Sequence, residues 1–186
     1  MDNSNTTLDE FRYQQRGYAK YGDIARLFGW QALKDFFYQE NLDFNAGKLT
    51  CFESPVCLDG LAQVDSRILR FSKAAGADLT PLIHFWGVHP DNSTALAQAI
   101  TAAGLSSSTI VRDKLVYYAG IAPTNNAQFN THFETVFPGR PSNCASPHYG
   151  CGWYNVWTDK FNESHGDNIT TRMQSLLSQY FPGTNL

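Results

Sequence analysis

The sequence has few charged residues and no long hydrophobic run. Charged residues make up 17% of the 186 residues, against about 25% in an average soluble protein. No stretch approaches the roughly 18 to 20 consecutive apolar residues that span a bilayer, and residues 1–7 lack the pattern of a signal peptide. The formal net charge is −3 and no run of Lys or Arg occurs, so a basic surface for phosphates is missing. We therefore expect no membrane span and no nucleic-acid partner.

Common catalytic motifs are also missing. We find no Gly-rich phosphate loop, no nucleophile elbow and no paired catalytic carboxylates. Zinc peptidases use an H-E-x-x-H helix, in which two His bind the metal and the Glu acts as general base. The histidines are His84, His89, His132, His148 and His165, and none of them begins this motif. We therefore assign no catalytic residue, no metal ligand and no cofactor within this chain.

Apolar residues recur at helical spacing, and Gly or Pro ends most of the runs. With 42% apolar and 14% aromatic residues, the chain has enough apolar side chains to form the core of a single folded domain over residues 1–186. About eight such runs occur and no convincing alternating strand, which predicts an all-α fold, a compact bundle of about eight short helices. The first two runs are Tyr18, Tyr21, Ile24, Ala25 and Phe28, then Trp30, Leu33, Phe36 and Phe37.

Polar residues before several runs predict where the helices begin, since side-chain oxygens there can accept hydrogen bonds from free backbone N–H groups. The expected caps are Asp65 or Ser66 for the third helix, Thr80 for the fourth, and Asn92 or Ser93 for the fifth. The last helix is expected to begin near Asp167 and to stop before Pro182.

The four cysteines fall in two close pairs within the expected loops 41–60 and 138–152. Cys51 and Cys57 bracket the segment CFESPVC, and Cys144 and Cys151 bracket CASPHYGC. Two local disulfides that staple these loops are the simplest interpretation, and they indicate a secreted or cell-surface protein. The alternatives are four buried thiols in a cytosolic domain, or a zinc site at the second pair with His148. A structural zinc site needs four ligands, and only three lie close together here.

Two segments carry a family resemblance: YAKYGDIARLFGWQALKDFFYQ (18–39) and DSRILRFSKAAGADLTPLIHFWGVHP (65–90). They resemble the helical region downstream of the zinc site in the enhancin-like, mucin-targeting zinc metallopeptidases (the peptidase M-sixty-like family), which include accessory-colonization-factor-type bacterial proteins. The matching residues are Phe28, Gly29 and Trp30, then Ser72, Ala75, Gly76, Asp78, Leu79, Pro81, Trp86 and Gly87. The resemblance covers residues 18–90, about half of the chain.

This resemblance implies that the chain is the C-terminal helical region of a larger secreted enzyme. Its role would be to support the catalytic lobe of the parent chain and one wall of a cleft for glycoproteins or mucins. Zinc would be bound elsewhere in the parent protein, and this segment would be inactive alone. The alternatives from other classes are a stand-alone carbohydrate- or protein-binding module that uses exposed aromatics, and a small hydrolase with an unfamiliar His and Asp arrangement.

Two groups of residues are candidates for binding. His84, Trp86 and His89 in IHFWGVHP could line the cleft or contact the catalytic lobe. The alternative is that the two histidines belong to the core or to a helix end, where their ring nitrogens bond to the backbone. Trp153 and Trp157 lie four residues apart and would share one helical face, either as a platform that stacks on sugars or as part of a core.

Overall fold

The structure, a computed structural model, describes residues 10–47, 59–125, 127–129, 131, 135, 163–184 and 186. These residues are mainly helical and form no β-strand beyond an isolated bridge between Asp78 and Ser107. The predicted all-α class is thereby confirmed for the described part of the chain. No helix in these ranges is both long and apolar enough to cross a membrane.

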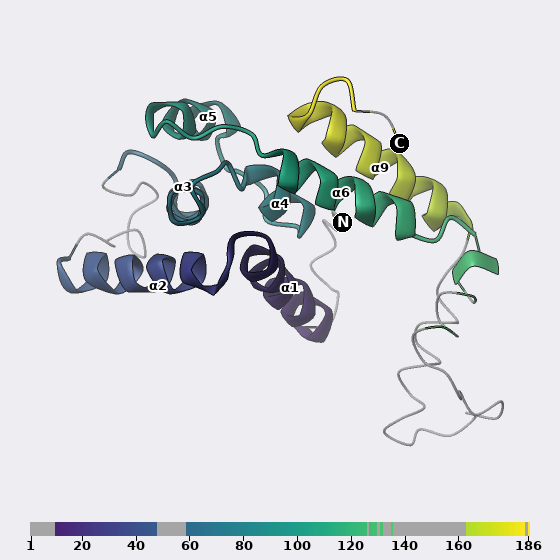
Figure 1. Cartoon of the computed structure of the whole chain (residues 1–186), viewed down its shortest axis with the longest axis horizontal. Coiled ribbons are helices and arrows are strands. Elements are labelled where there is room, and N and C mark those ends of the chain that lie inside the picture. Colours follow the sequence, from purple (N-terminus) through teal and green to yellow (C-terminus); the bar gives the residue numbers. More distant parts are fainter. Residues whose placement is uncertain are drawn as a thin grey trace, which may run out of the picture.

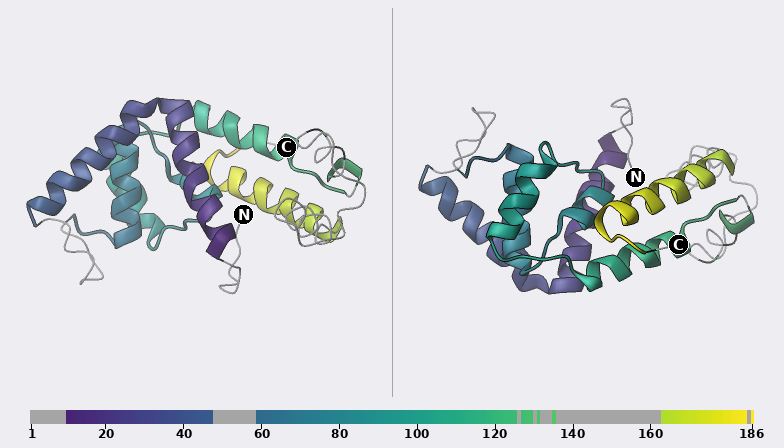
Figure 2. Two further views of the ribbon diagram at one scale, coloured as in Figure 1. Left: turned by 90° about the horizontal axis from the view of Figure 1, so that it is seen from below. Right: turned by 90° about the horizontal axis from the view of Figure 1, so that it is seen from above.

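The helices form three layers (Figure 1). They are α1 (Glu10–Phe28), α2 (Trp30–Asn45), α3 (Gln63–Ala75), α4 (Thr80–Phe85), α5 (Ser93–Ala102), α6 (Thr109–Ile121) and α9 (Glu163–Tyr180). Helices α1 and α2 make one outer layer, and α5, α6 and α9 make the other. The central helices α3 and α4 lie between them, with α2 and α5 against α3, and α6 and α9 against α4. Figure 2 shows both outer layers, with α1 and α2 meeting in a V.

Glycines with positive φ set two of the helix boundaries. Gly29 has a φ of 84° and separates α1 from α2, as the sequence predicts. Gly76, with a φ of 69°, ends α3, where its N–H donates to the Lys73 carbonyl and the N–H of Ala77 donates to the Ser72 carbonyl. This pair of bonds satisfies carbonyls at the end of the helix. The chain can therefore turn sharply from α3 into α4.

Three predicted helix starts need correction. Helix α3 begins at Gln63, so Asp65 and Ser66 lie inside its first turn, and no side chain caps it. Thr80 is the first residue of α4 and not its cap; Asp78 accepts a hydrogen bond from the Thr80 N–H at 2.8 Å. Helix α9 begins at Glu163 and not near Asp167. Two of these polar residues have other roles. The Asp65 carboxylate binds the loop before α5, and Thr80 is buried.

The start of α5 is predicted correctly, and the end of α2 is not. Asn92 caps α5, and its side-chain oxygen accepts from the Ala95 N–H at 3.0 Å, as the sequence predicts. Helix α2 continues to Asn45, so the loop expected to start at residue 41 begins later.

The core extends through all three layers. Fully buried residues come from α1, α4, α6 and α9 and from the turn between α3 and α4: Ile24, Leu79, Leu82, Val111, Leu115 and Leu177. Phe36 of α2 stacks on Phe71 of α3, with ring centroids 3.5 Å apart. The predicted apolar faces of α1 and α2 are wrong at three positions, because Tyr18, Trp30 and Phe37 are 72%, 70% and 49% exposed.

Candidate functional site

Helix α4 and the loop after it hold the three binding candidates His84, Trp86 and His89. The helix has six residues, and five of them are buried: Thr80, Pro81, Leu82, Ile83 and Phe85. Pro81 at the second helical position suits the first turn, where N–H groups have no intrahelical partner. Because α3, α6 and α9 all pack against α4, side chains at its C-terminal end meet different neighbours.

His84 and His89 form one cluster with Tyr180 of α9. The His84 Nδ1 and the Tyr180 hydroxyl lie 2.8 Å apart, and the two imidazole rings are edge to face with centroids 4.3 Å apart. Burial, and then the negative charge of Asp78, raises the pKa of Tyr180 to about 12. Tyr180 is therefore an uncharged phenol at neutral pH. The cluster ties the end of α9 to the end of α4.

Trp86 does not join this cluster. Its indole Nε1 donates to the Asp23 carboxylate of α1 at 2.9 Å. The Tyr118 hydroxyl of α6 donates to the same carboxylate, at 2.7 and 2.8 Å from its two oxygens. Lys114 Nζ lies 3.8 Å from Asp23 Oδ1. The structure therefore separates the predicted trio into two sites.

Asp23 is the centre of a polar network between three elements. Its exposure is only 3%, and a buried carboxylate needs such donors to offset the loss of hydration. Burial, and then the hydrogen bond to Asp23, raises the pKa of Tyr118 well above its ordinary value. The Lys114 ammonium lies 4.4 Å from the centroid of the Tyr118 ring, where a cation is attracted to the aromatic face. The network joins α1, α6 and the end of α4.

Asp65 is a second buried carboxylate, and it is fully inaccessible to solvent. Its two oxygens accept hydrogen bonds from the N–H groups of Asp91 and Asn92, each at 2.8 Å. These bonds fix the chain between His89 and the start of α5. Both carboxylates thus hold segments of the chain together, and no described nucleophile and base are arranged around either of them.

Among the described helices, α2 carries the largest number of exposed large apolar side chains. Five side chains on this helix are at least 43% exposed: Trp30, Phe37, Tyr38, Leu42 and Phe44. We call these five residues the α2 face. Single exposed apolar residues are common on proteins, but a group of this size on one element is typical of an interaction surface.

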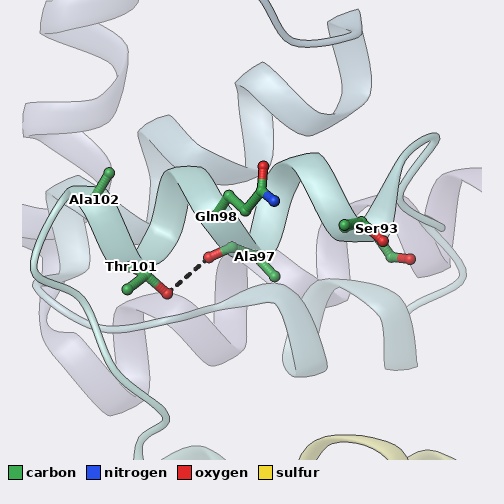
Figure 3. Close-up of a pocket in the computed structure, with 6 residues that line it drawn as sticks. Ser93, Ala97, Gln98, Thr101 and Ala102 are labelled. Carbon is green, nitrogen blue, oxygen red and sulfur yellow. Dashed lines mark hydrogen bonds between the residues drawn. The ribbon is translucent and has the colours of Figure 1, made fainter.

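A hollow along α5 does not form a comparable site. Ser93, Thr94, Ala97, Gln98, Thr101 and Ala102 line it, and all six are exposed residues of one helix (Figure 3). The Thr101 hydroxyl donates to the Ala97 carbonyl of its own helix at 2.9 Å. No second element among the described residues lines the hollow, so as described it lacks the enclosed shape of a small-molecule pocket.

Other predicted residues lie outside the described part of the chain. They are Cys51, Cys57, Cys144, Cys151, Trp153 and Trp157, together with the side chains of His132, His148 and His165. Within the described part, no group of three or more His, Cys, Asp or Glu side chains could hold a metal ion.

Sequence reasoning missed Asp23, Tyr118 and Tyr180. Asp23 directly precedes Ile24 and Ala25, which belong to the buried face of α1. An acidic residue beside a buried run was the available signal, because a carboxylate there needs partners from other elements. Helical periodicity alone places Tyr118 and Tyr180 on apolar faces and does not reveal their hydroxyl partners.

No family model, curated protein or solved structure matches this chain.

Proposed function

We propose that this chain is the non-catalytic C-terminal helical lobe of a secreted zinc metallopeptidase that acts on glycoproteins such as mucins. The observation that carries the proposal is that the two segments resembling that family pack into a single unit. Asp23 lies in the first segment and Trp86 in the second, 63 residues later, and they share a hydrogen bond of 2.9 Å. Helices α1 to α4, which hold most of both segments, pack in sequence against one another.

Several residues of the family-like pattern have structural roles here. The Ser72 hydroxyl accepts from the Leu79 N–H at 3.0 Å, Asp78 accepts from the Thr80 N–H, and Gly76 adopts the left-handed conformation that ends α3. These roles fit a supporting lobe, because they fix the turn between α3 and α4. His84 and His89 would then lie at the edge that faces the catalytic lobe or the substrate.

Zinc would be bound by the catalytic lobe and not by this chain. The described residues offer no group of three ligands, which does not fit the three or four protein ligands of zinc sites. We also propose disulfides between Cys51 and Cys57 and between Cys144 and Cys151, in keeping with secretion. Thiol titration of the denatured, unreduced protein should find no free thiol, whereas four free thiols would contradict this part of the proposal.

The proposal is tested by assaying the purified chain on a mucin-type glycoprotein with added zinc, with and without chelator. We expect no proteolysis and no stoichiometric bound zinc, while an active zinc peptidase on the same substrate serves as the positive control. Robust proteolysis that the chelator abolishes would contradict the proposal. A parent reading frame without an H-E-x-x-H motif would contradict it independently.

The α2 face favours a second candidate, a binding module for protein or carbohydrate. Trp30 is 70% exposed on this face, and exposed aromatic rings can stack on sugars or fill a pocket on a protein. Glycan titration followed by tryptophan fluorescence distinguishes these possibilities. A change in the wild type that is lost in Trp30→Phe would support a carbohydrate module, and the same response in both proteins would point to another tryptophan.

A further inference from the structure

The α2 face has the geometry of a helix-packing seam. Trp30, Phe37 and Phe44 are spaced by seven residues, so they lie nearly in line along the helix, with a drift of about 20° per step. At 1.5 Å per residue, the line is about 21 Å long. Tyr38 and Leu42 form a second exposed apolar group further around the same helix. A straight line of large apolar side chains suits another helix as its partner.

Few charges interrupt this face. Helical geometry places Lys34 between Phe37 and Tyr38 and places Asp35 beside Leu42, seven residues later, while Asp43 lies on the opposite side of the helix. Glu40 is turned toward Arg67 and Arg70 of α3, at 3.6 and 3.9 Å. The side chains of Asn41 and Asn45 are hydrogen-bonded to each other at 2.8 Å. Depletion of charge around aromatic residues is typical of the centre of a protein interface.

The exposed area is large enough for a dimer of modest affinity. A buried aromatic side chain covers about 150–250 Å², and the four aromatics of the face are between 49% and 70% exposed. Together with Leu42 they present about 550 Å² of apolar surface, near the upper limit of patches on monomers. Two copies would bury at most about 1,100 Å² of this apolar surface before any polar residue is counted, close to the lower end of stable interfaces.

We propose that two copies of this chain associate through their α2 faces, antiparallel and around a two-fold axis at Phe37. Trp30 and Phe44 are equally far from Phe37 in sequence, so Trp30 of each copy meets Phe44 of the other. A closed two-fold contact of this kind uses the same patch on both copies. Lys34 of one copy then lies level with residue 40 of the second copy and not beside another lysine. This proposal does not depend on the metallopeptidase proposal.

Sedimentation and light scattering over a range of concentrations test the association. We expect a dimer with a dissociation constant in the micromolar range, which fits an interface of about this size. Phe44→Glu should weaken association by about tenfold or more, because a charge would be buried in each half of the interface. Phe44 is 63% exposed, so this variant should fold, as circular dichroism can verify. Tyr38→Glu at another exposed site serves as the second variant.

A charge pair tests the antiparallel arrangement. Trp30→Lys alone should weaken the dimer, but the double variant Trp30→Lys/Phe44→Glu should regain most of the association at low salt and lose it at high salt. A parallel dimer would place lysine beside lysine and would not regain it. Ile110→Glu is the matched control, since Ile110 is 51% exposed on α6 and should leave association unchanged.

Three results would overturn the proposal. They are a wild-type chain that stays monomeric at concentrations well above the micromolar range, a dimer that Phe44→Glu leaves intact, and a double variant that does not regain association. A monomer whose Trp30 fluorescence responds to a glycan would also overturn it and would assign the face to carbohydrate. None of these results depends on whether the chain has proteolytic activity.

Discussion

Helices α2 and α4 both carry several large apolar side chains, but they bury different proportions of them. Helix α4 packs against α3, α6 and α9 and buries five of its six residues. Helix α2 packs against α1 and α3 on one side and buries Ala32, Leu33 and Phe36. Its other side exposes aromatic rings. The difference comes from the position of each helix in the layers, because a central helix has neighbours on every side and an outer helix does not.

The carboxylates around the central helices and those on α2 also differ in their hydrogen-bond partners. Around the central helices, the buried carboxylates Asp23 and Asp65 each accept at least two hydrogen bonds from other elements. On α2, Asp35 and Asp43 accept from glutamines one turn away on the same helix, at 2.6 and 2.9 Å. Bonds across elements fix the tertiary structure, whereas bonds within an exposed helix add a few tenths of a kcal/mol. We therefore expect the fold to depend on α3 and α4, and association to depend on α2.

The largest effect should follow from a cavity in the central layer. Leu82 is fully buried in α4, so Leu82→Ala should lower the free energy of unfolding by about 3–4 kcal/mol. Trp30→Ala removes a larger side chain that is 70% exposed, and it should cost less than about 1 kcal/mol. Urea unfolding at equal protein concentration measures both. Equal losses in the two variants would contradict the division between the layers.

A somewhat smaller effect should follow from removing a buried acceptor. Asp65→Ala leaves the N–H groups of Asp91 and Asn92 without their acceptor, and it should cost about 3 kcal/mol. The matched control is Asp35→Ala, because Asp35 is exposed and accepts a hydrogen bond from Gln31 of its own helix; it should cost less than about 0.5 kcal/mol. Urea unfolding again provides the values. A loss below about 1 kcal/mol for Asp65→Ala would mean that water replaces the carboxylate.

The sequence predicted the helices of the central layer well because their signals are local. The spacing of Ile68, Leu69 and Phe71, and the glycine at position 76, identify α3 and its end without knowledge of its neighbours. Helix starts were less reliable: Asp65 looks like a cap, yet it bonds to residues 26 and 27 positions away. The sequence does not show such a distant partner. The exposure of Trp30 and Phe37 escaped prediction for the same reason, because an apolar run does not indicate which layer covers it.

The candidate site was predicted only in part. His84 and His89 do come together, but Trp86 belongs to the Asp23 network, and the partner residues come from α1, α6 and α9. Helical periodicity places side chains on faces of one helix and does not say which faces meet. The family resemblance, the disulfides and the roles of Trp153 and Trp157 remain predictions.

The cluster at the end of α4 should make stability depend on alkaline pH. The pKa of Tyr180 is raised from 10.0 to about 12, mainly by burial and then by Asp78, so the folded state favours the uncharged phenol. The contribution of the Tyr180 phenol to folding stability is fully present below pH 10 and is lost as the pH rises toward 12. The ring is partly exposed, and solvent screening limits the loss to about 1 kcal/mol.

Unfolding of the wild type and Tyr180→Phe in a pH series isolates this effect. The stability advantage of the wild type should shrink above pH 10, because phenylalanine has no proton to lose. Tyr118→Phe is measured in parallel, because the pKa of Tyr118 is raised in the same direction as that of Tyr180. A difference in the free energy of unfolding between wild type and Tyr180→Phe that stays constant with pH would show that the pKa of the Tyr180 phenol is not raised in the folded state.

The smallest effects should come from two glycines, one in each kind of layer. Gly22 lies within the outer helix α1, and Gly76 ends the central helix α3 with a φ of 69°. A Cβ added at either position would meet nothing within 4 Å, so the backbone alone decides the result. Gly22→Ala should raise stability by about 0.5–1 kcal/mol, because alanine is the better helix former. Gly76→Ala should lower it by about 1 kcal/mol, because alanine is strained in the left-handed conformation. Thermal unfolding of the two variants should therefore shift in opposite directions, and a shift of the same sign in both would mean that one of these backbone conformations is not the one in solution.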